Sequence, residues 1–210
     1  MRILLTNAGK RYNREWIFRH VHYEFLPGDS YAITGPNGSG KSTLLQVLSG
    51  AIAANEGSVS FIRETAQLPP EHQFREVSIC APYLEVIEEM SALEFLQFHA
   101  RFKPFIGHLE PREIIRLVQL DHAADKQIRY FSSGMKQRIK LAQAILTKAP
   151  VVLLDEPCTN LDTEGIALYL QLIHEYSLDR CIIVSSNDET EYRFCRHRLD
   201  MNSIKPQGGN

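Results

Sequence analysis

The sequence lacks the features that would require a membrane span, a metal cluster or a disulfide framework. No apolar run approaches the roughly 18 residues of a membrane-spanning helix, and the N-terminal MRILLTNAGKRYNREW has too short an apolar stretch for a secretory signal. The four cysteines lie far apart without CxxC spacing, which argues against a zinc site or a redox pair. We therefore expect a soluble chain in a reducing cytosol, where any membrane role comes through a partner.

Charge of one sign is also scarce. The formal net charge is −2 over 210 residues, which gives no electrostatic footprint for nucleic acid. Arg193, Arg196 and Arg198 form the one basic cluster near the end, and we interpret it as a solvated helix face. Cys80 and Cys181 lie in apolar runs and are interpreted as small buried hydrophobic residues.

Short apolar runs alternate with helical patterns, which is typical of an α/β fold with a mainly parallel sheet. Residues 16–26 alternate enough for an antiparallel hairpin, and the polar stretch 63–75 is expected to be a loop. No repeat or linker interrupts the chain, so we expect one domain, 1–210, with a helical lobe at about 84–149. The patterns predict strands at 2–6, 16–26, 30–34, 57–62, 77–81, 151–155 and 181–185, and helices at 41–49, 91–102, 111–120, from about 133, and at 162–176.

A glycine-rich turn follows the predicted strand 30–34. Residues 35–42, GPNGSGKS, match the pattern G-x-x-x-x-G-K-[ST] of a phosphate-binding loop. Glycines let successive backbone N–H groups curl around a β-phosphate, and the following helix adds its positive N-terminal end. Lys41 would reach the β- and γ-phosphates, and the Ser42 hydroxyl would bind Mg²⁺. The sequence thus predicts ATP and Mg²⁺ as ligands.

Two acids, Asp155 and Glu156, end the apolar strand 151–155. A buried parallel strand delivers its last side chains to the edge of the sheet where phosphates bind. Asp155 would hold Mg²⁺ through its water shell. Glu156 could then polarise a water in line with the γ-phosphate. We therefore expect ATP hydrolysis.

A third motif points to a family. Residues 131–138, FSSGMKQR, resemble the LSGGQ signature and its following Gln-Arg, which is diagnostic of ATP-binding cassette (ABC) ATPases. Residues 155–157 and 159–162 resemble the family's Asp-Glu-Pro motif and D-loop, and Tyr12 resembles the aromatic residue that stacks on adenine. Over essentially its whole length the chain resembles the ATP-binding subunit of an ABC transporter. The resemblance implies a P-loop NTPase core of the ABC type, with an N-terminal antiparallel β portion and an inserted helical lobe.

The residue types of the signature turn are suited to binding an anion. Small residues that open a helix offer backbone N–H groups and hydroxyls to a second anion, and in the ABC family this turn closes on the ATP of the other subunit. The resemblance therefore implies a homodimer or heterodimer with separate transmembrane permease subunits, peripheral at the cytoplasmic face of the cell membrane. The resulting assignments are nucleotide contacts at Tyr12, Gly35, Pro36, Asn37, Gly38, Ser39, Gly40, Lys41, Ser42, Thr43, Ser132, Ser133, Gly134 and Asn187, metal contacts at Ser42 and Asp155, and catalysis at Lys41 and Glu156.

Four positions depart from the family pattern. Ser133 replaces the second signature glycine and Met135 the glutamine after Gly134, both small changes for binding through the backbone. Tyr83 stands where the family has the Q-loop glutamine, and Asn187 stands where it has the switch histidine. Asparagine can donate a hydrogen bond to phosphate but cannot shuttle a proton. These two departures predict slow hydrolysis.

Two other classes of protein share part of this pattern. A nucleoside or nucleotide kinase shares the phosphate loop, but it would not place an SSGMKQR-type helix before an Asp-Glu strand. An ABC ATPase of signalling, repair or ribosome association would keep the fold, although the repair and ribosomal types carry coiled-coil insertions, zinc modules or tandem cassettes, which this sequence lacks. The transported substrate and the direction of transport stay open.

Overall fold

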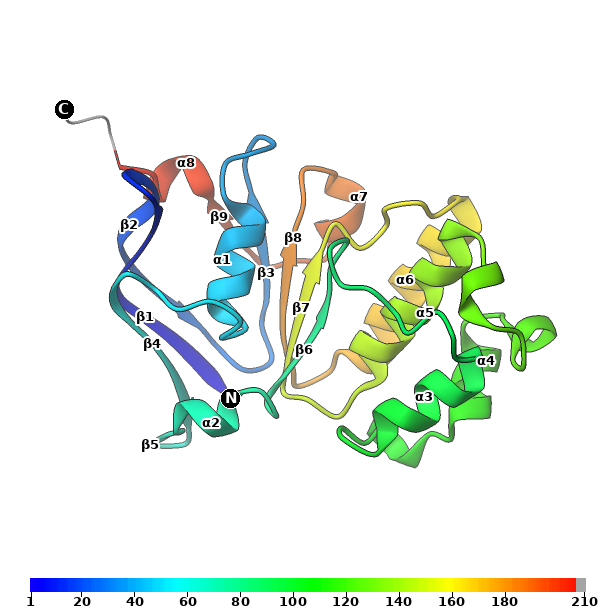
Figure 1. Cartoon of the computed structure of the whole chain (residues 1–210). Helices are drawn as coiled ribbons and strands as arrows, with labels where there is room; N and C mark the ends of the chain where they lie inside the picture. Colours follow the sequence, from blue (N-terminus) through cyan, green and yellow to red (C-terminus); the bar gives the residue numbers. More distant parts are fainter. Residues whose placement is uncertain (207–210) are drawn as a thin grey trace.

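The computed structural model describes residues 1–206 and contains two sheets with a helix between them (Figure 1). The N-terminal sheet is antiparallel, with strand order β2-β1-β4-β5. The second sheet has the order β6-β7-β8-β3-β9, and its neighbouring strands are parallel. The strands are β1 (Arg2–Tyr12), β2 (Glu15–Phe25), β3 (Ser30–Thr34), β4 (Glu56–Arg63), β5 (Ala66–Gln67), β6 (Val77–Cys80), β7 (Val151–Asp155), β8 (Cys181–Ser185) and β9 (His197–Asp200).

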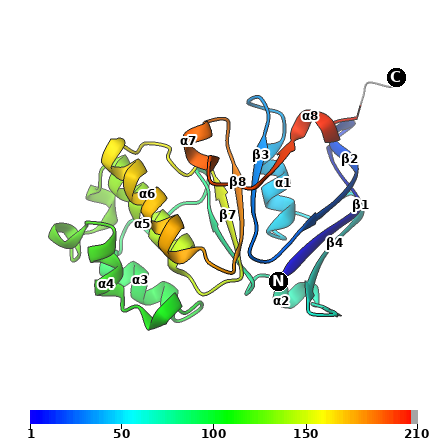
Figure 2. The same cartoon turned by 180° about the vertical axis from the view of Figure 1, so that it is seen from behind.

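Helices cover both faces of the parallel sheet. One helix, α1, lies between the two sheets, whereas α3, α4, α5 and α6 gather on the opposite face of the parallel sheet, as both views show (Figures 1 and 2). No helix within residues 1–206 is long and apolar enough to cross a membrane. The helices are α1 (Lys41–Leu48), α2 (Pro70–Gln73), α3 (Ala92–Ala100), α4 (Pro111–Leu117), α5 (Ser133–Leu146), α6 (Thr163–Tyr176), α7 (Glu189–Tyr192) and α8 (Met201–Ile204), with 3₁₀ turns η1 (Ile106–His108), η2 (Asp121–Ala123) and η3 (Ile128–Tyr130).

Alternating side chains of the parallel strands divide the interior into two cores. Val151 and Leu153 of β7 pack with α1 and the N-terminal sheet, whereas Val152 and Leu154 pack with α5 and α6. This division follows from the two-residue period of a strand, which sends successive side chains to opposite faces. A fully apolar strand such as VVLLD is therefore suited to a sheet that is covered on both sides.

The predicted fold class is confirmed, and three local expectations are corrected. The stretch 63–75 is not a plain loop, because it contains β5 and α2; the two prolines open α2, where a missing N–H costs no helix bond. The first strand continues beyond 2–6 as far as Tyr12, past register shifts in its pairing with β2. The cluster of Arg193, Arg196 and Arg198 is not a helix face, because Arg198 lies in a fifth parallel strand, β9, beside β3.

Gly57 lets β4 approach the backbone of β1 closely. Its φ is +68°, and a Cβ at this position would lie 2.2 Å from the carbonyl oxygen of Asn7 and 2.3 Å from that of Thr6. Backbone atoms of a paired strand cannot move aside as the end of a side chain can. Glycine is required here both for its conformation and for the missing side chain.

We expect Gly57→Ala to lower the free energy of unfolding by about 3 kcal/mol or more, since strain and a backbone clash add. The matched control is Gly28→Ala. Its φ is +76° but nothing lies within 4 Å of an added Cβ, so only about 1 kcal/mol of conformational strain is expected. Urea unfolding of both variants measures the difference. Equal losses would show that the contact with β1 plays no part.

Candidate nucleotide site

Three loops meet at the C-terminal edge of the parallel sheet. Ser185 pairs with Ile33 of β3 and with Asp155 of β7, so the three strands end at the same level. Two backbone bonds continue this alignment beyond the strands: the Ser186 N–H donates to the Ile33 oxygen at 3.1 Å, and the Glu156 N–H donates to the Ser185 oxygen at 2.9 Å. The glycine-rich loop, the acidic pair and the segment that contains Asn187 therefore extend from one edge, as the sequence predicts.

The glycine-rich loop curls tightly into the start of α1. Three of its glycines have positive φ, including Gly40 at +100°, the residue that precedes α1. A Cβ on Gly40 would lie 2.0 Å from the Cγ2 atom of Ile17 on β2, so the N-terminal sheet packs directly against this loop. No side chain caps the helix. The first N–H groups of α1 are thus available to an anion.

Lys41 lies where the glycine-rich loop meets α1, and its charge is not exposed at the surface. Its side chain is buried, and its ammonium group donates to the carbonyl oxygens of Gly35 at 2.8 Å and Pro36 at 3.3 Å. The loop carbonyls replace water around the charge, which is the condition for burying an ammonium group. Removing Lys41 therefore disturbs the loop as well as the charge.

The acidic pair combines an unsatisfied carboxylate with a strained backbone. Asp155 is 2% exposed, and its Oδ1 atom has no hydrogen-bond partner within residues 1–206. The hydroxyls of Ser39 and Ser185 are likewise buried without a partner in that part of the chain. Unpartnered buried polar atoms are costly, so their grouping at one edge fits a hydrated cation and phosphate. Glu156 has a φ of +44°, a conformation that side chains other than glycine rarely adopt and that clusters at functional sites.

Two of the four residues that depart from the family pattern, Tyr83 and Asn187, lie near the glycine-rich loop and the acidic pair. The Nδ2 atom of Asn187 donates to the Oδ1 atom of Asn37 at 2.8 Å. Burial raises the pKa of Tyr83 to about 12, and the neighbouring carboxylate of Asp155 raises it further, whereas a hydrogen bond with Gln46 on α1 opposes the rise. Tyr83 therefore stays a neutral phenol between the acidic pair and α1.

The signature turn lies elsewhere. Ser132 caps α5, with its hydroxyl accepting from the Met135 N–H at 3.2 Å. Because α5 and α1 cover opposite faces of the parallel sheet (Figure 1), the structure does not bring this turn to the phosphate loop. The signature turn borders a hollow of about 420 Å³ whose lining includes Ser132, Ser133, Gly134, Asn160 and Asp162.

Tyr12, the expected adenine contact, ends β1 with half of its surface exposed and with the Lys10 ammonium 5.4 Å from its ring centroid.

Two buried polar residues near the acidic pair had no role assigned to them from the sequence, although Gln137 belongs to the signature resemblance. Gln137 of α5 and Glu191 of α7 are 4% and 5% exposed, and both hydrogen-bond to the segment that follows Glu156. Helical spacing could have found Gln137, because it shares a face with the buried Leu141. Glu191 carries no comparable signal, since it lies in a short acidic stretch.

A phosphate loop opens a helix on one face of the sheet, and a second turn of small residues opens a helix on the other face. This combination defines an ATPase of the ATP-binding cassette class. The family model described as ABC transporter matches residues 18–159. An uncharacterized ABC transporter ATP-binding protein of Bacillus subtilis is 30% identical, covering 95% of this chain and 92% of the relative. The chain therefore belongs to the ABC transporter family.

Two further comparisons agree. The cytochrome c biogenesis ATP-binding export protein CcmA of Xylella fastidiosa is 35% identical, over 70% of this chain and 66% of that protein. The dimeric structure of an ATP-binding cassette in a post-hydrolysis state, bound to ADP and phosphate, has the same fold, with a TM-score of 0.81 and 22% identity over 97% of this chain and 94% of that one. The chain is the ATP-binding subunit of an ABC transporter and energises transport. The kinase alternative is excluded, and transport is favoured over the other ABC functions.

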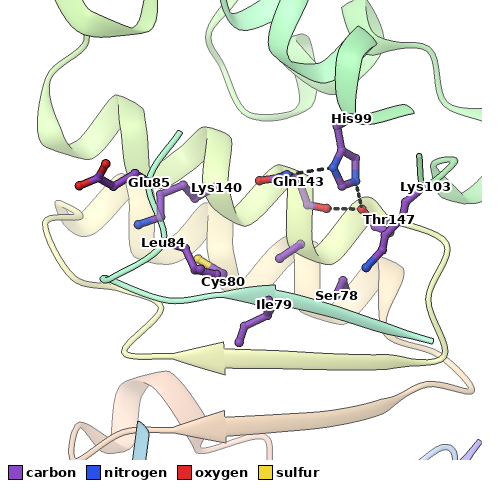
Figure 3. Close-up of a pocket in the computed structure, with 11 residues that line it drawn as sticks. Ser78, Ile79, Cys80, Leu84, Glu85, His99, Lys103, Lys140, Gln143 and Thr147 are labelled. Carbon is purple, nitrogen blue, oxygen red and sulfur yellow. Dashed lines mark hydrogen bonds between the residues drawn. The ribbon is translucent and has the colours of Figure 1, made fainter. Parts of the chain in front are cut away.

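A separate hollow of about 220 Å³ lies between β6, α3 and α5, away from the phosphate loop (Figure 3). His99 lies at its wall, where Gln143 contacts Nδ1 at 2.9 Å and Thr147 contacts Nε2 at 2.7 Å. The amide donates to Nδ1, so the ring is neutral and donates through Nε2. Burial lowers the pKa of His99 to about 4, and the Lys103 ammonium contributes to the shift.

This pKa predicts a loss of stability in acid. Between pH 6.5 and about 4 the unfolded chain binds a proton at His99 that the folded chain excludes. The contribution is therefore fully present above pH 6.5 and is lost as the pH falls toward 4. We expect His99→Gln to reduce the difference in unfolding free energy between pH 7 and pH 5, with His108→Gln as a control on an exposed turn. Identical pH dependence in wild type and His99→Gln would contradict the assignment.

Proposed function

We propose that the chain is one nucleotide-binding domain, 1–210, with its helical lobe at about 84–149, and that it hydrolyses ATP in a sandwich dimer. The observation that carries the proposal is the separation of the two anion-binding turns, because α1 and α5 cover opposite faces of one sheet. A phosphate loop and a signature turn that cannot meet within one chain can meet between two chains. The partner is a second copy or a related cassette, arranged so that each turn faces the other's loop.

Within this dimer, residues of both chains would contact each nucleotide. The loop Gly35–Thr43 would surround the phosphates, with Lys41 turning from the loop carbonyls toward the β- and γ-oxygens. Tyr12 would stack on adenine, and Asn187 would donate to a γ-phosphate oxygen. From the other chain, Ser132, Ser133 and Gly134 would close on the same phosphates.

The unsatisfied oxygens fit a magnesium ion as the metal cofactor. Ser42 would bind it directly and Asp155 through water, which would satisfy the orphaned Oδ1 atom. When bound, Mg²⁺ neutralises charge on the phosphates. Glu156 accepts a proton from the attacking water while the water oxygen bonds to the γ-phosphorus. The bond between the γ-phosphorus and the oxygen that leaves with ADP breaks in the same step.

The conformational changes of this ATPase cycle would be transmitted to separate membrane-spanning chains. The cassette would lie at the cytoplasmic face of the membrane. Tyr83, Leu84 and Ile87 are exposed apolar side chains within five residues, a grouping that suits contact with a partner. Leu84 also borders a hollow of about 410 Å³ that reaches Ser133 of the signature turn and Lys136 of α5. A partner seated there would contact both the Tyr83 segment and the signature helix.

Glu156→Gln should trap the dimer. The amide keeps the size of the side chain but cannot accept the proton, so ATP stays intact and the two chains stay together. Sedimentation of the variant with Mg-ATP should show a dimer, whereas the nucleotide-free chain is mainly a monomer. Lys41→Ala is the control that should abolish detectable ATP binding and stay monomeric. A monomer at saturating Mg-ATP, even with the membrane partners supplied, would contradict the shared site.

Hydrolysis should be slow in the wild type, because two transition-state contacts are altered. Tyr83 is a neutral phenol that already bonds to Gln46, and the Asn187 amide is directed at Asn37. Losing one such contact typically costs about 2.7–4 kcal/mol, or roughly 10²–10³ in rate. We expect the double variant Tyr83→Gln, Asn187→His to raise the maximal rate more than it changes apparent affinity. Steady-state ATPase assays test this, and a double variant no faster than wild type would mean that the native pair is fully competent.

A further inference from the structure

One peptide bond next to Glu156 is held at both of its polar atoms by buried side chains. The Nε2 atom of Gln137 donates to the carbonyl oxygen of Pro157 at 2.6 Å. The Oε1 atom of Glu191 accepts from the N–H of Cys158 at 2.7 Å. The Pro157 carbonyl and the Cys158 N–H belong to the same planar peptide unit. We call this arrangement, formed by Gln137, Glu191 and the Pro157–Cys158 peptide, the peptide clamp.

The members of the clamp are buried and make further contacts, although the Oε2 atom of Glu191 has no hydrogen-bond partner within residues 1–206. Gln137 also lies 3.8 Å from the Sγ atom of Cys80, a buried residue on β6. The hydroxyl of Tyr169 on α6 donates to the backbone oxygen of Glu191 at 2.8 Å and anchors α7. Breaking a hydrogen bond of a buried group leaves its partner unsatisfied and costs more than the bond itself contributes. The peptide therefore has one well-defined orientation.

The clamp joins the signature helix α5 and the segment that follows Asn187 to the proposed catalytic base. Gln137 lies one helical turn after Gly134 of the signature turn, and Glu191 lies four residues after Asn187. Glu156 directly precedes the Pro157–Cys158 peptide that these two residues hold, and its φ is +44°. A residue in this strained conformation persists only where the surrounding structure fixes it.

We infer that Gln137 and Glu191 are positioning residues for ATP hydrolysis, which hold the Pro157–Cys158 peptide and thereby aim the Glu156 carboxylate. The inference rests on the proposed role of Glu156 as the base. A displacement of about 1 Å at a catalytic group can cost about 10²-fold in rate. Neither residue belongs to the phosphate loop, so loss of the clamp should lower kcat and leave nucleotide binding intact.

Gln137→Met keeps the volume and the helix propensity of the side chain but removes the donor to Pro157. We expect kcat to fall at least tenfold, with KM and Mg-ATP affinity within about twofold of wild type. Calorimetric titration with a non-hydrolysable ATP analogue measures the affinity separately from the rate. The matched control is Gln143→Met, on the same helix, which loses a hydrogen bond to His99 outside the clamp and should keep wild-type kcat.

Substitutions at Glu191 test the other side of the peptide. Glu191→Gln keeps an acceptor for the Cys158 N–H and should hydrolyse ATP within about threefold of wild type, whereas Glu191→Met should match the loss in Gln137→Met. The double variant Gln137→Met, Glu191→Met should be no slower than the worse single variant, because both act through one peptide. If Glu191→Met fails to fold, Gln137→Met and Glu191→Gln decide by the same measurements.

The inference is overturned if Gln137→Met keeps wild-type kcat, if its affinity falls in parallel with its rate, or if the two losses simply multiply. Glu156→Gln separates this failure from failure of the proposed function. If Glu156→Gln hydrolyses ATP at the wild-type rate, the base assignment fails, and the inference fails with it. If Glu156→Gln is inactive while Gln137→Met is fully active, only the inference fails.

Discussion

Hydrogen bonding between β3, β7 and β8 aligns the C-terminal ends of these strands, and the nucleotide site extends from that alignment. Ser185 pairs with residues on both neighbours, so the loops that follow Thr34, Asp155 and Ser185 start at one level. Parallel strands impose this arrangement, because their carboxyl ends share an edge. The Glu156 N–H continues the ladder by one more bond, to Ser185. The strained φ of Glu156 follows where the ladder ends.

The same strands explain why we propose a site that is shared between two chains. Alternate side chains of β7 and β8 enter two different cores, one built with α1 and one with α5. The helix behind the phosphate loop and the helix behind the signature turn are thus held on opposite sides of a fully buried sheet. Bringing the two turns together within one chain would require dismantling one core. Pairing two chains would satisfy both turns with both cores intact, and the proposed dimer thus links association to hydrolysis.

The sequence predicted those parts of the fold and site that depend on short-range patterns. Buried strands, amphipathic helices and the phosphate loop each have a signal within about ten residues. What it missed depends on contacts between distant segments. The buried environment of Lys41 arises from how the loop carbonyls fold back, and β5 arises from pairing to β4. The clamp joins residues 137, 157 and 191, and no local pattern encodes that meeting.

Tyr83 and Asn187 differ in what they offer to the proposed nucleotide. Asn187 would exchange its bond to the neutral Asn37 for one to a phosphate oxygen, and charge-assisted bonds are roughly twice as strong as neutral ones. Tyr83 stays a neutral phenol, because burial and the Asp155 carboxylate both disfavour its ionised form, so it is a poor ligand for a cation. The segment that contains Tyr83 connects β6 to α3 and presents Leu84 and Ile87 to solvent. A partner that binds these two side chains would therefore contact the same segment that carries Tyr83.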